Sequence, residues 1–212
     1  GNDGALSKNN KYEYSKIIDV PDLSFVGKVY SGLDILEQMD FKPLRNKTIA
    51  ILTNQSAVNR NNQHLLDILT RYPDIKVKYL LSMEHGIWST DDKRSKMVGR
   101  DGISPMHKAQ IIDLFKTYLN PPSWVMRDID LVLVDYQDTG SRYTTYTTTL
   151  SKVFESASDF EIPVFILDRP NPIRGDLISG PIPRSEFQSF ESYHLFPIRH
   201  GLTIGEMSLI IN

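Results

Sequence analysis

Four segments rich in apolar residues recur along the chain, and each is followed by a group of polar residues. Such segments, 4 to 8 residues long, are typical of buried strands. The predicted strands are residues 47–52, 76–81, 129–134 and 162–167. The clearest is 129–134, a continuous apolar run of the kind that is buried on both faces of a sheet.

Helical patterns lie between these strands. The predicted helices are residues 32–37, residues 62–69, residues 143–158 and a last helix that follows Thr203. Thr203 can cap that last helix, because Glu206 stands three residues further on as its capping-box partner. The stretch 91–128 is less regular, and Pro121-Pro122 excludes one long helix across it.

Strands and helices that alternate at this spacing predict a parallel sheet with right-handed crossovers. We therefore expect an α/β fold, a Rossmann-like three-layer sandwich with a mostly parallel sheet. Residues 1–24 are mainly polar and are predicted to be a flexible tail. Residues 25–212 are predicted to form one domain.

The amino-acid composition argues against some classes of function for this chain. The 212 residues carry a formal net charge of −2, so neither a nucleic-acid surface nor an anionic-membrane surface is expected. No apolar run is long enough to span a bilayer, and cysteine is absent. The chain begins with Gly1, and its polar opening suits the tether of a secreted or lipid-anchored protein. A trimmed cytoplasmic protein fits that opening nearly as well.

The polar groups that follow the strands are the candidate site, because ligands of open parallel sheets bind beyond the carboxyl ends of the strands. Nucleotide binding is not expected there. The first strand ends in Thr53-Asn54-Gln55-Ser56-Ala57 without glycine, and no GxxxxGK[ST] loop exists. Sequence motifs that bind a catalytic metal, such as HExxH, are also missing, and so is the GxSxG motif of serine nucleophiles. The sequence thus predicts no cofactor and no metal.

The carboxylates in these groups suggest acid–base chemistry. Glu84 precedes His85 and Gly86, and a strand-end acid of this kind can act as general acid or base. It can equally satisfy loop amides. Asp135 and Asp138, if close together, would push their pKa values apart. Alternatively Arg142 neutralises one of them, or a strand-end Asp caps the next helix.

Two further loops hold polar side chains. Asp168-Arg169-Pro170-Asn171-Pro172 has two proline rings that fix its backbone, which suits hydrogen bonding to a polyhydroxyl ligand. It also suits a structural ion pair between Asp168 and Arg169. Arg199-His200-Gly201 precedes the last helix, where Arg199 can hold an anionic group or pair with an Asp of a nearby loop.

Taken in order, these motifs resemble the exo-β-N-acetylmuramidase (NamZ) family from about Gly32 onward. The motifs are Thr53-Asn54-Gln55, Glu84-His85-Gly86, the run from Gln137 to Tyr146, Asp168-Arg169-Pro170-Asn171-Pro172, Gly180-Pro181 and the run from Arg199 to Glu206. The resemblance implies a Rossmann-like N-terminal domain, a second domain absent from this chain, and an active site between the two. It implies a glycoside hydrolase that removes N-acetylmuramic acid from the non-reducing ends of peptidoglycan fragments. We expect such an enzyme to act in cell-wall turnover, and to be periplasmic or lipid-anchored in the cell envelope.

The resemblance also assigns candidate roles. Glu84 matches the family's acid, and its partner carboxylate is sought among Asp138, Asp135 and Asp168, unless the sugar's acetamido group assists instead. Arg142, Arg169 or Arg199 would pair with the lactyl carboxylate, since a guanidinium binds carboxylates bidentately. The remaining candidates for sugar contacts are Asn54, Gln55, His85, Gln137, Asn171 and His200. The rival interpretation is a non-catalytic glycan-binding protein that uses the same loops.

Overall fold

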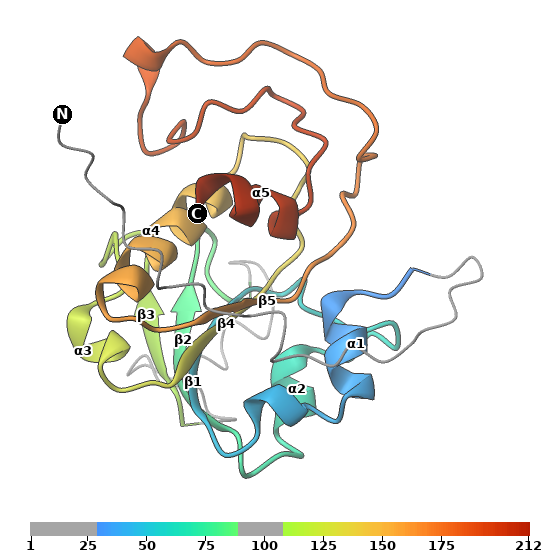
Figure 1. Cartoon of the computed structure of the whole chain (residues 1–212), viewed down its shortest axis with the longest axis vertical. Coiled ribbons are helices and arrows are strands. Elements are labelled where there is room, and N and C mark those ends of the chain that lie inside the picture. The colour runs from blue at the N-terminus through green and yellow to red at the C-terminus, as the bar shows by residue number, and fades with distance from the viewer. Residues whose placement is uncertain (1–28, 89–107) are drawn as a thin grey trace, which may run out of the picture.

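A computed structural model describes residues 29–88 and 108–212, so the predicted tail 1–24 lies outside the described residues. Figure 1 shows the described elements in place. In chain order they are α1 (Gly32–Gln38), η2 (Lys42–Leu44), β1 (Thr48–Thr53), α2 (Leu65–Leu69), β2 (Lys76–Ser82), β3 (Gln110–Asp113), α3 (Ser123–Met126), β4 (Leu131–Asp135), α4 (Tyr146–Asp159), β5 (Val164–Ile166), η4 (Ser185–Phe187) and α5 (Ile204–Ile211).

The strands form one sheet in the order β3-β2-β1-β4-β5. All four neighbouring pairs are parallel, which confirms the predicted α/β class. β1 is the central strand, and its Ile51 lies between Leu80 of β2 and Leu133 of β4. Because the strands are parallel, the groups that follow β1, β2 and β4 emerge at the same edge of the sheet.

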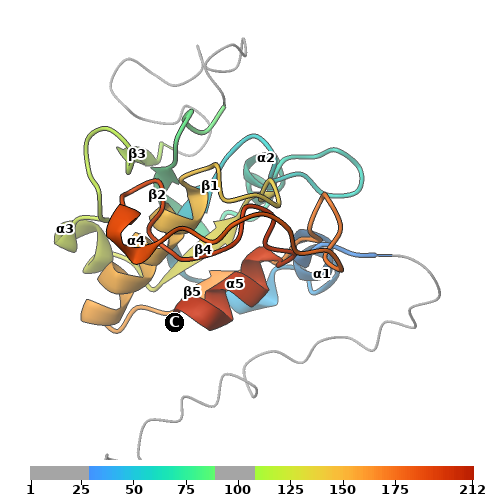
Figure 2. The ribbon, with the colours of Figure 1, turned by 90° about the horizontal axis from the view of Figure 1, so that it is seen from above.

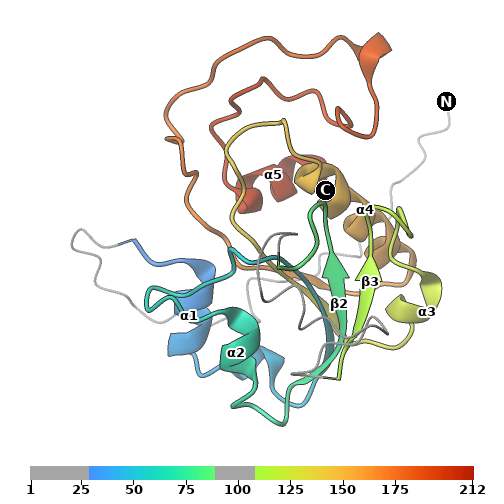
Figure 3. The ribbon, with the colours of Figure 1, turned by 180° about the vertical axis from the view of Figure 1, so that it is seen from behind.

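Helices cover both faces of the sheet, as a three-layer sandwich requires. Successive β1 side chains point to opposite faces: Ile51 joins the core cluster of α1 and α2, whereas Leu52 joins that of α3, α4 and α5. Figure 2 shows the two helix groups from above, and Figure 3 shows α1 and α2 well apart from α3 and α4. Apolar packing on each face fixes the sheet in the middle layer.

The structure differs from the predictions at several boundaries. β3 and α3 were not predicted, since each has only four residues. The predicted helix 62–69 begins only at Leu65, because Asn62 has a left-handed φ of 56° and His64 caps the helix by accepting a hydrogen bond from the Leu66 amide. The predicted helix 143–158 begins at Tyr146. The last helix has the predicted capping box of Thr203 and Glu206.

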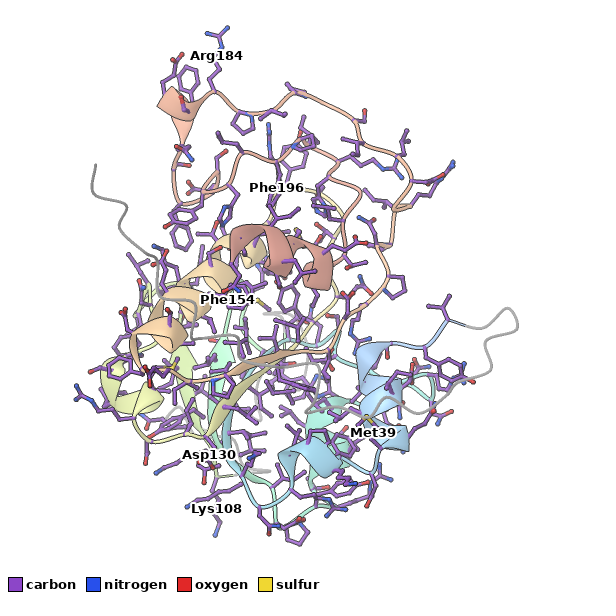
Figure 4. All side chains as sticks on the ribbon, in the orientation of Figure 1. Met39, Lys108, Asp130, Phe154, Arg184 and Phe196 are labelled. Atoms are coloured by element: carbon purple, nitrogen blue, oxygen red, sulfur yellow. The ribbon has the colours of Figure 1, made fainter. Side chains whose placement is uncertain are left out.

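A long connection joins β5 to α5 and loops out beyond α4 and α5, with Arg184 at its far end (Figures 1 and 4). Its last part returns to the sheet edge, where Arg199 makes antiparallel bridges with Ser141 and Ser179. These bridges bring the residues around His200 beside the loop that follows β4. Within the described ranges, no helix has the length and apolarity needed to cross a membrane.

Candidate active site

Glu84 stands just beyond the end of β2, and one of its two carboxylate oxygens is held. Its Oε2 accepts hydrogen bonds from the Thr145 hydroxyl at 2.8 Å and from the Thr145 amide at 3.4 Å. Its Oε1 lies 3.9 Å from His85 Nε2. The Glu84 side chain is 26% exposed and that of His85 is 63% exposed. One oxygen is therefore fixed by the protein, and the other lies on the open side.

The local backbone explains why Glu84 stays at this position. His85 and Gly86 have φ values of 69° and 75°, so the chain turns sharply after Glu84. Glycine adopts this conformation without steric cost, and His85 adopts it at some cost. Thr145 is the N-cap of α4, so the carboxylate lies at the positive end of a helix dipole.

Asp138 is almost fully buried and is also held through one oxygen. Its Oδ2 accepts from the Gly140 amide at 2.7 Å and lies 3.2 Å from His200 Nε2. His200 Nδ1 accepts from the Leu202 amide, so the ring proton is on Nε2, which donates to Asp138. The other oxygen, Oδ1, is buried and has no hydrogen-bond partner among the described residues.

Tyr146 interacts electrostatically with both Glu84 and Asp138, and Tyr136 interacts with Asp138. Burial raises the pKa of Tyr146, a hydrogen bond with Asn54 lowers it, and the negative charges of Glu84 and Asp138 raise it. Burial, followed by Asp138 and Tyr146, raises the pKa of Tyr136 well above its usual value. The two rings meet edge to face at 5.5 Å. Both phenols therefore stay protonated and can donate hydrogen bonds.

Sequence reasoning gave no role to Thr145, Tyr146 or Tyr136. Thr145 and Tyr146 belong to the run from Gln137 to Tyr146, one of the motifs of the NamZ resemblance, and this membership could have marked them as site residues. Tyr136 stands between Asp135 and Gln137, and nothing in its sequence context marks it. Asn54, which was a candidate, is buried, and its Oδ1 accepts hydrogen bonds from the Ser56 amide and hydroxyl.

Asp135 and Arg169 form a buried ion pair apart from Glu84. Arg169 Nε and Nη2 donate to the two Asp135 oxygens at 2.7 and 3.1 Å. Arg169 Nη1 donates to the Val58 carbonyl. Burial raises the pKa of Asp135 to about 6, although the Arg169 guanidinium acts to lower it. Both Asp135 oxygens are bonded, Asp135 has no exposed surface and the Arg169 side chain is only 7% exposed. These contacts favour a structural role for the pair.

Four other candidates hold loops together. Arg142 Nη1 donates to the carbonyls of Pro181 and Phe196, both at 2.8 Å. Asp168 accepts from the Gly205 amide and the Thr203 hydroxyl, so it holds the start of α5 and does not pair with the Arg169 guanidinium. Asn171 donates to the Leu202 carbonyl and Gln137 donates to that of Pro170. Each of these side chains is already engaged by the protein.

Arg199 differs from the other two candidate arginines. Within the described ranges its guanidinium makes no hydrogen bond and no ion pair, and its Nε is buried without a partner. Gln55 and His85 are exposed at the same sheet edge. Among the residues that the structure describes, no group of three or more His, Asp or Glu side chains is placed to hold a metal ion.

The family model for the N-terminal region of exo-β-N-acetylmuramidase NamZ matches residues 49–212. The chain belongs to this family. A peptidoglycan β-N-acetylmuramidase NamZ of Bacillus subtilis strain 168 is 35% identical over 185 residues, which are 87% of this chain and 44% of the relative. The chain thus spans less than half the length of that relative.

Two solved structures support the fold. Two DUF1343 family proteins from Bacteroides fragilis align with TM-scores of 0.76 and 0.72 at 30% and 31% identity. They cover 86% and 87% of this chain, and the chain covers 45% and 46% of theirs. The NamZ resemblance that the motifs carried is therefore confirmed, and so is the Rossmann-like layering.

Proposed function

We propose that this chain supplies one wall of the active site of an exo-β-N-acetylmuramidase, which releases N-acetylmuramic acid from the non-reducing ends of peptidoglycan fragments. Membership of the NamZ family and the likeness to the Bacillus subtilis enzyme support this function. The observation that carries it is the Glu84 carboxylate, which is half-buried at the sheet edge with one oxygen bonded and one open. The second domain of the longer relatives would form the opposite wall.

Glu84 is the proposed general acid and base. It would protonate the glycosidic oxygen as the bond to the sugar C1 breaks, and would then take a proton from the attacking water. Asp138 is the first choice for a second carboxylate, because its Oδ1 is not engaged by the described residues. Participation of the substrate's acetamido group is the alternative, and it needs no second carboxylate.

Arg199 is the proposed partner of the lactyl carboxylate that distinguishes N-acetylmuramic acid from N-acetylglucosamine. Of the three arginines considered, Arg142 is bonded to two carbonyls and Arg169 to Asp135. Only Arg199 keeps its guanidinium available, and this group binds carboxylates bidentately. Gln55, which is exposed, is the proposed hydrogen-bond partner of the sugar hydroxyls.

Glu84→Gln tests the catalytic assignment in the protein at its natural full length. The substrate is the disaccharide of N-acetylmuramic acid β-linked to N-acetylglucosamine, and release of N-acetylmuramic acid is measured. We expect turnover to fall by a factor of about 10² to 10⁴, because general acid–base catalysis contributes roughly that much. Glu186→Gln, at an exposed position of η4, is the matched control.

The outcomes distinguish the proposed enzyme from a non-catalytic glycan-binding protein. Binding of the disaccharide without turnover by the natural protein would establish a glycan-binding role instead. Near-normal turnover by Glu84→Gln would remove Glu84 from the catalytic machinery while leaving the enzyme class in place.

We infer that the protein works in the cell envelope, in the periplasm or lipid-anchored, in cell-wall turnover. The location of peptidoglycan, the substrate of the proposed activity, supports this. Fractionation of cells that express the natural gene tests the location, and recovery in the cytoplasm alone would contradict it.

A further inference from the structure

Thr145 occupies the N-cap of α4 but does not cap the helix with its side chain. A threonine at this position usually accepts a hydrogen bond from the amide two or three residues on. Here no such bond forms, and the hydroxyl donates to Glu84 Oε2 at 2.8 Å. The Thr145 backbone, at φ −81° and ψ 6°, lies outside the extended region that an N-cap residue usually adopts. The Thr145 hydroxyl is therefore not used by the helix and is available to Glu84.

The backbone of Thr145 is fixed, so its hydroxyl is a fixed donor. Thr145 is buried. Its backbone carbonyl accepts from the Thr149 amide at 2.9 Å and from the Thr149 hydroxyl at 3.2 Å. Its own amide also points at Glu84 Oε2, at 3.4 Å. The first turn of α4 thus directs two donors at the same carboxylate oxygen.

Two donors on Oε2 make the two oxygens of Glu84 chemically different. An oxygen that accepts from a hydroxyl and an amide serves best as the carbonyl oxygen of a protonated carboxyl group. The transferable proton then resides on Oε1, the oxygen that faces the exposed His85. The same contacts limit rotation of the Glu84 side chain, which has three rotatable bonds.

We propose that Thr145 is a positioning residue, whose hydroxyl fixes Oε2 of Glu84 so that Oε1 holds and delivers the proton of glycoside cleavage. This inference rests on the proposed muramidase function. Thr145 itself does not touch the substrate. A displacement of about 1 Å at a catalytic group can lower the rate by about 10²-fold, so loss of this contact should act on turnover.

The test compares Thr145→Val, Thr145→Ser and Thr148→Val in the protein at its natural full length. Valine keeps the shape and removes the hydroxyl, whereas serine restores the hydroxyl. Thr148 is the matched control, because it lies in the same helix, is equally buried, and donates to the Phe190 carbonyl at 2.8 Å instead of to Glu84.

With the muramic disaccharide as substrate, we expect Thr145→Val to lower kcat by about 10- to 100-fold with KM nearly unchanged. Thr145→Ser should recover most of the loss, and Thr148→Val should keep kcat within about twofold. Equal losses in Thr145→Val and Thr148→Val, or no recovery with serine, would overturn the positioning role.

Crystal structures of the natural protein and of Thr145→Val keep the two proposals distinguishable. If the natural protein has no muramidase activity, the proposed function fails, and the structures still test the contact. We expect one Glu84 conformer in the natural protein and a rotated or multiple Glu84 carboxylate in the valine variant. An unchanged Glu84 in the valine variant would overturn the inference whatever the activity.

Discussion

Polar side chains at this sheet edge divide into those whose polar atoms are all bonded within the protein and those with one carboxylate oxygen left unbonded. Arg169 and Asp135 belong to the first kind, since every oxygen of the pair is bonded. Glu84 and Asp138 belong to the second, with one oxygen bonded and the other not. Asp138 Oδ1 is buried without a partner among the described residues, which costs free energy, and Glu84 Oε1 lies on the open side. These two oxygens are therefore the ones to examine for function.

Arg169→Met should destabilise the fold by about 3–5 kcal/mol at pH 7.5, because it leaves the Asp135 carboxylate buried without a partner. The loss should be smaller at pH 5. Burial already raises the pKa of Asp135 to about 6, and removal of the guanidinium raises it further. At pH 5 the folded variant therefore holds this carboxyl protonated and neutral.

The sign of the pH dependence follows from linkage. A carboxyl whose pKa is raised on folding favours the folded state at low pH, and this contribution is lost as the pH rises from about 4 through its folded pKa. Urea unfolding at the two pH values measures the difference. Arg174→Met, in an exposed pair with Asp176, should have no measurable effect. A loss in Arg169→Met that is equal at both pH values would contradict the assignment.

At the scale of elements, α1 meets the end of β5 through a glycine. The Gly32 amide donates to the Asp168 carbonyl at 2.7 Å. A Cβ on Gly32 would lie 2.6 Å from both the Asp168 nitrogen and the Leu167 Cα. Both neighbours are backbone atoms, so the helix and the strand could separate only by a shift of a whole element.

Gly32→Ala should therefore destabilise the protein, although alanine is the better helix former by up to about 1 kcal/mol. We expect a net loss of about 1–3 kcal/mol from overpacking, measured by urea unfolding. Gln38→Ala, at an exposed position of the same helix, should change stability by less than about 0.5 kcal/mol. A gain in stability for Gly32→Ala would show that the contact between α1 and β5 is looser than described.

Across the whole molecule, the sheet is most deeply buried at its centre. All but one residue of β1 and every residue of β4 are buried, whereas β5 at one edge is only half-buried and β3 at the other is mixed. Local opening begins where few apolar contacts hold the backbone.

Amide hydrogen exchange should follow this order in the protein at its natural full length. We expect the amides of β1 and β4 to exchange by the slowest, global route and those of β3 to exchange faster by local opening. Mass spectrometry of peptides that contain Ile51, Leu133 or Ile111 measures the three strands. Equal protection of β1 and β3 would mean that the sheet opens only as one unit.

The sequence predicted the layers better than it predicted the site. Apolar runs such as 129–134 mark buried strands directly, whereas β3 has only four residues, two of them polar. The polar groups at the strand ends were predicted as a set. Which of these side chains are bonded within the protein and which are left open was not predictable, because each bond depends on a partner distant in sequence. Arg169 meets Asp135 across 34 positions, Arg142 meets Phe196 across 54, and Thr145 meets Glu84 across 61.

The central place of β1 has a consequence for synthesis of the chain. β1 pairs with β4 along one whole side, and the contact between Thr48 and Asp130 spans 82 residues. At about 5–20 residues per second, the ribosome takes on the order of ten seconds to deliver that partner. Until then Ile49 and Ile51 present an apolar strand edge, which is a template for aggregation. A nascent chain paused between β2 and β4 is therefore the form most in need of a chaperone.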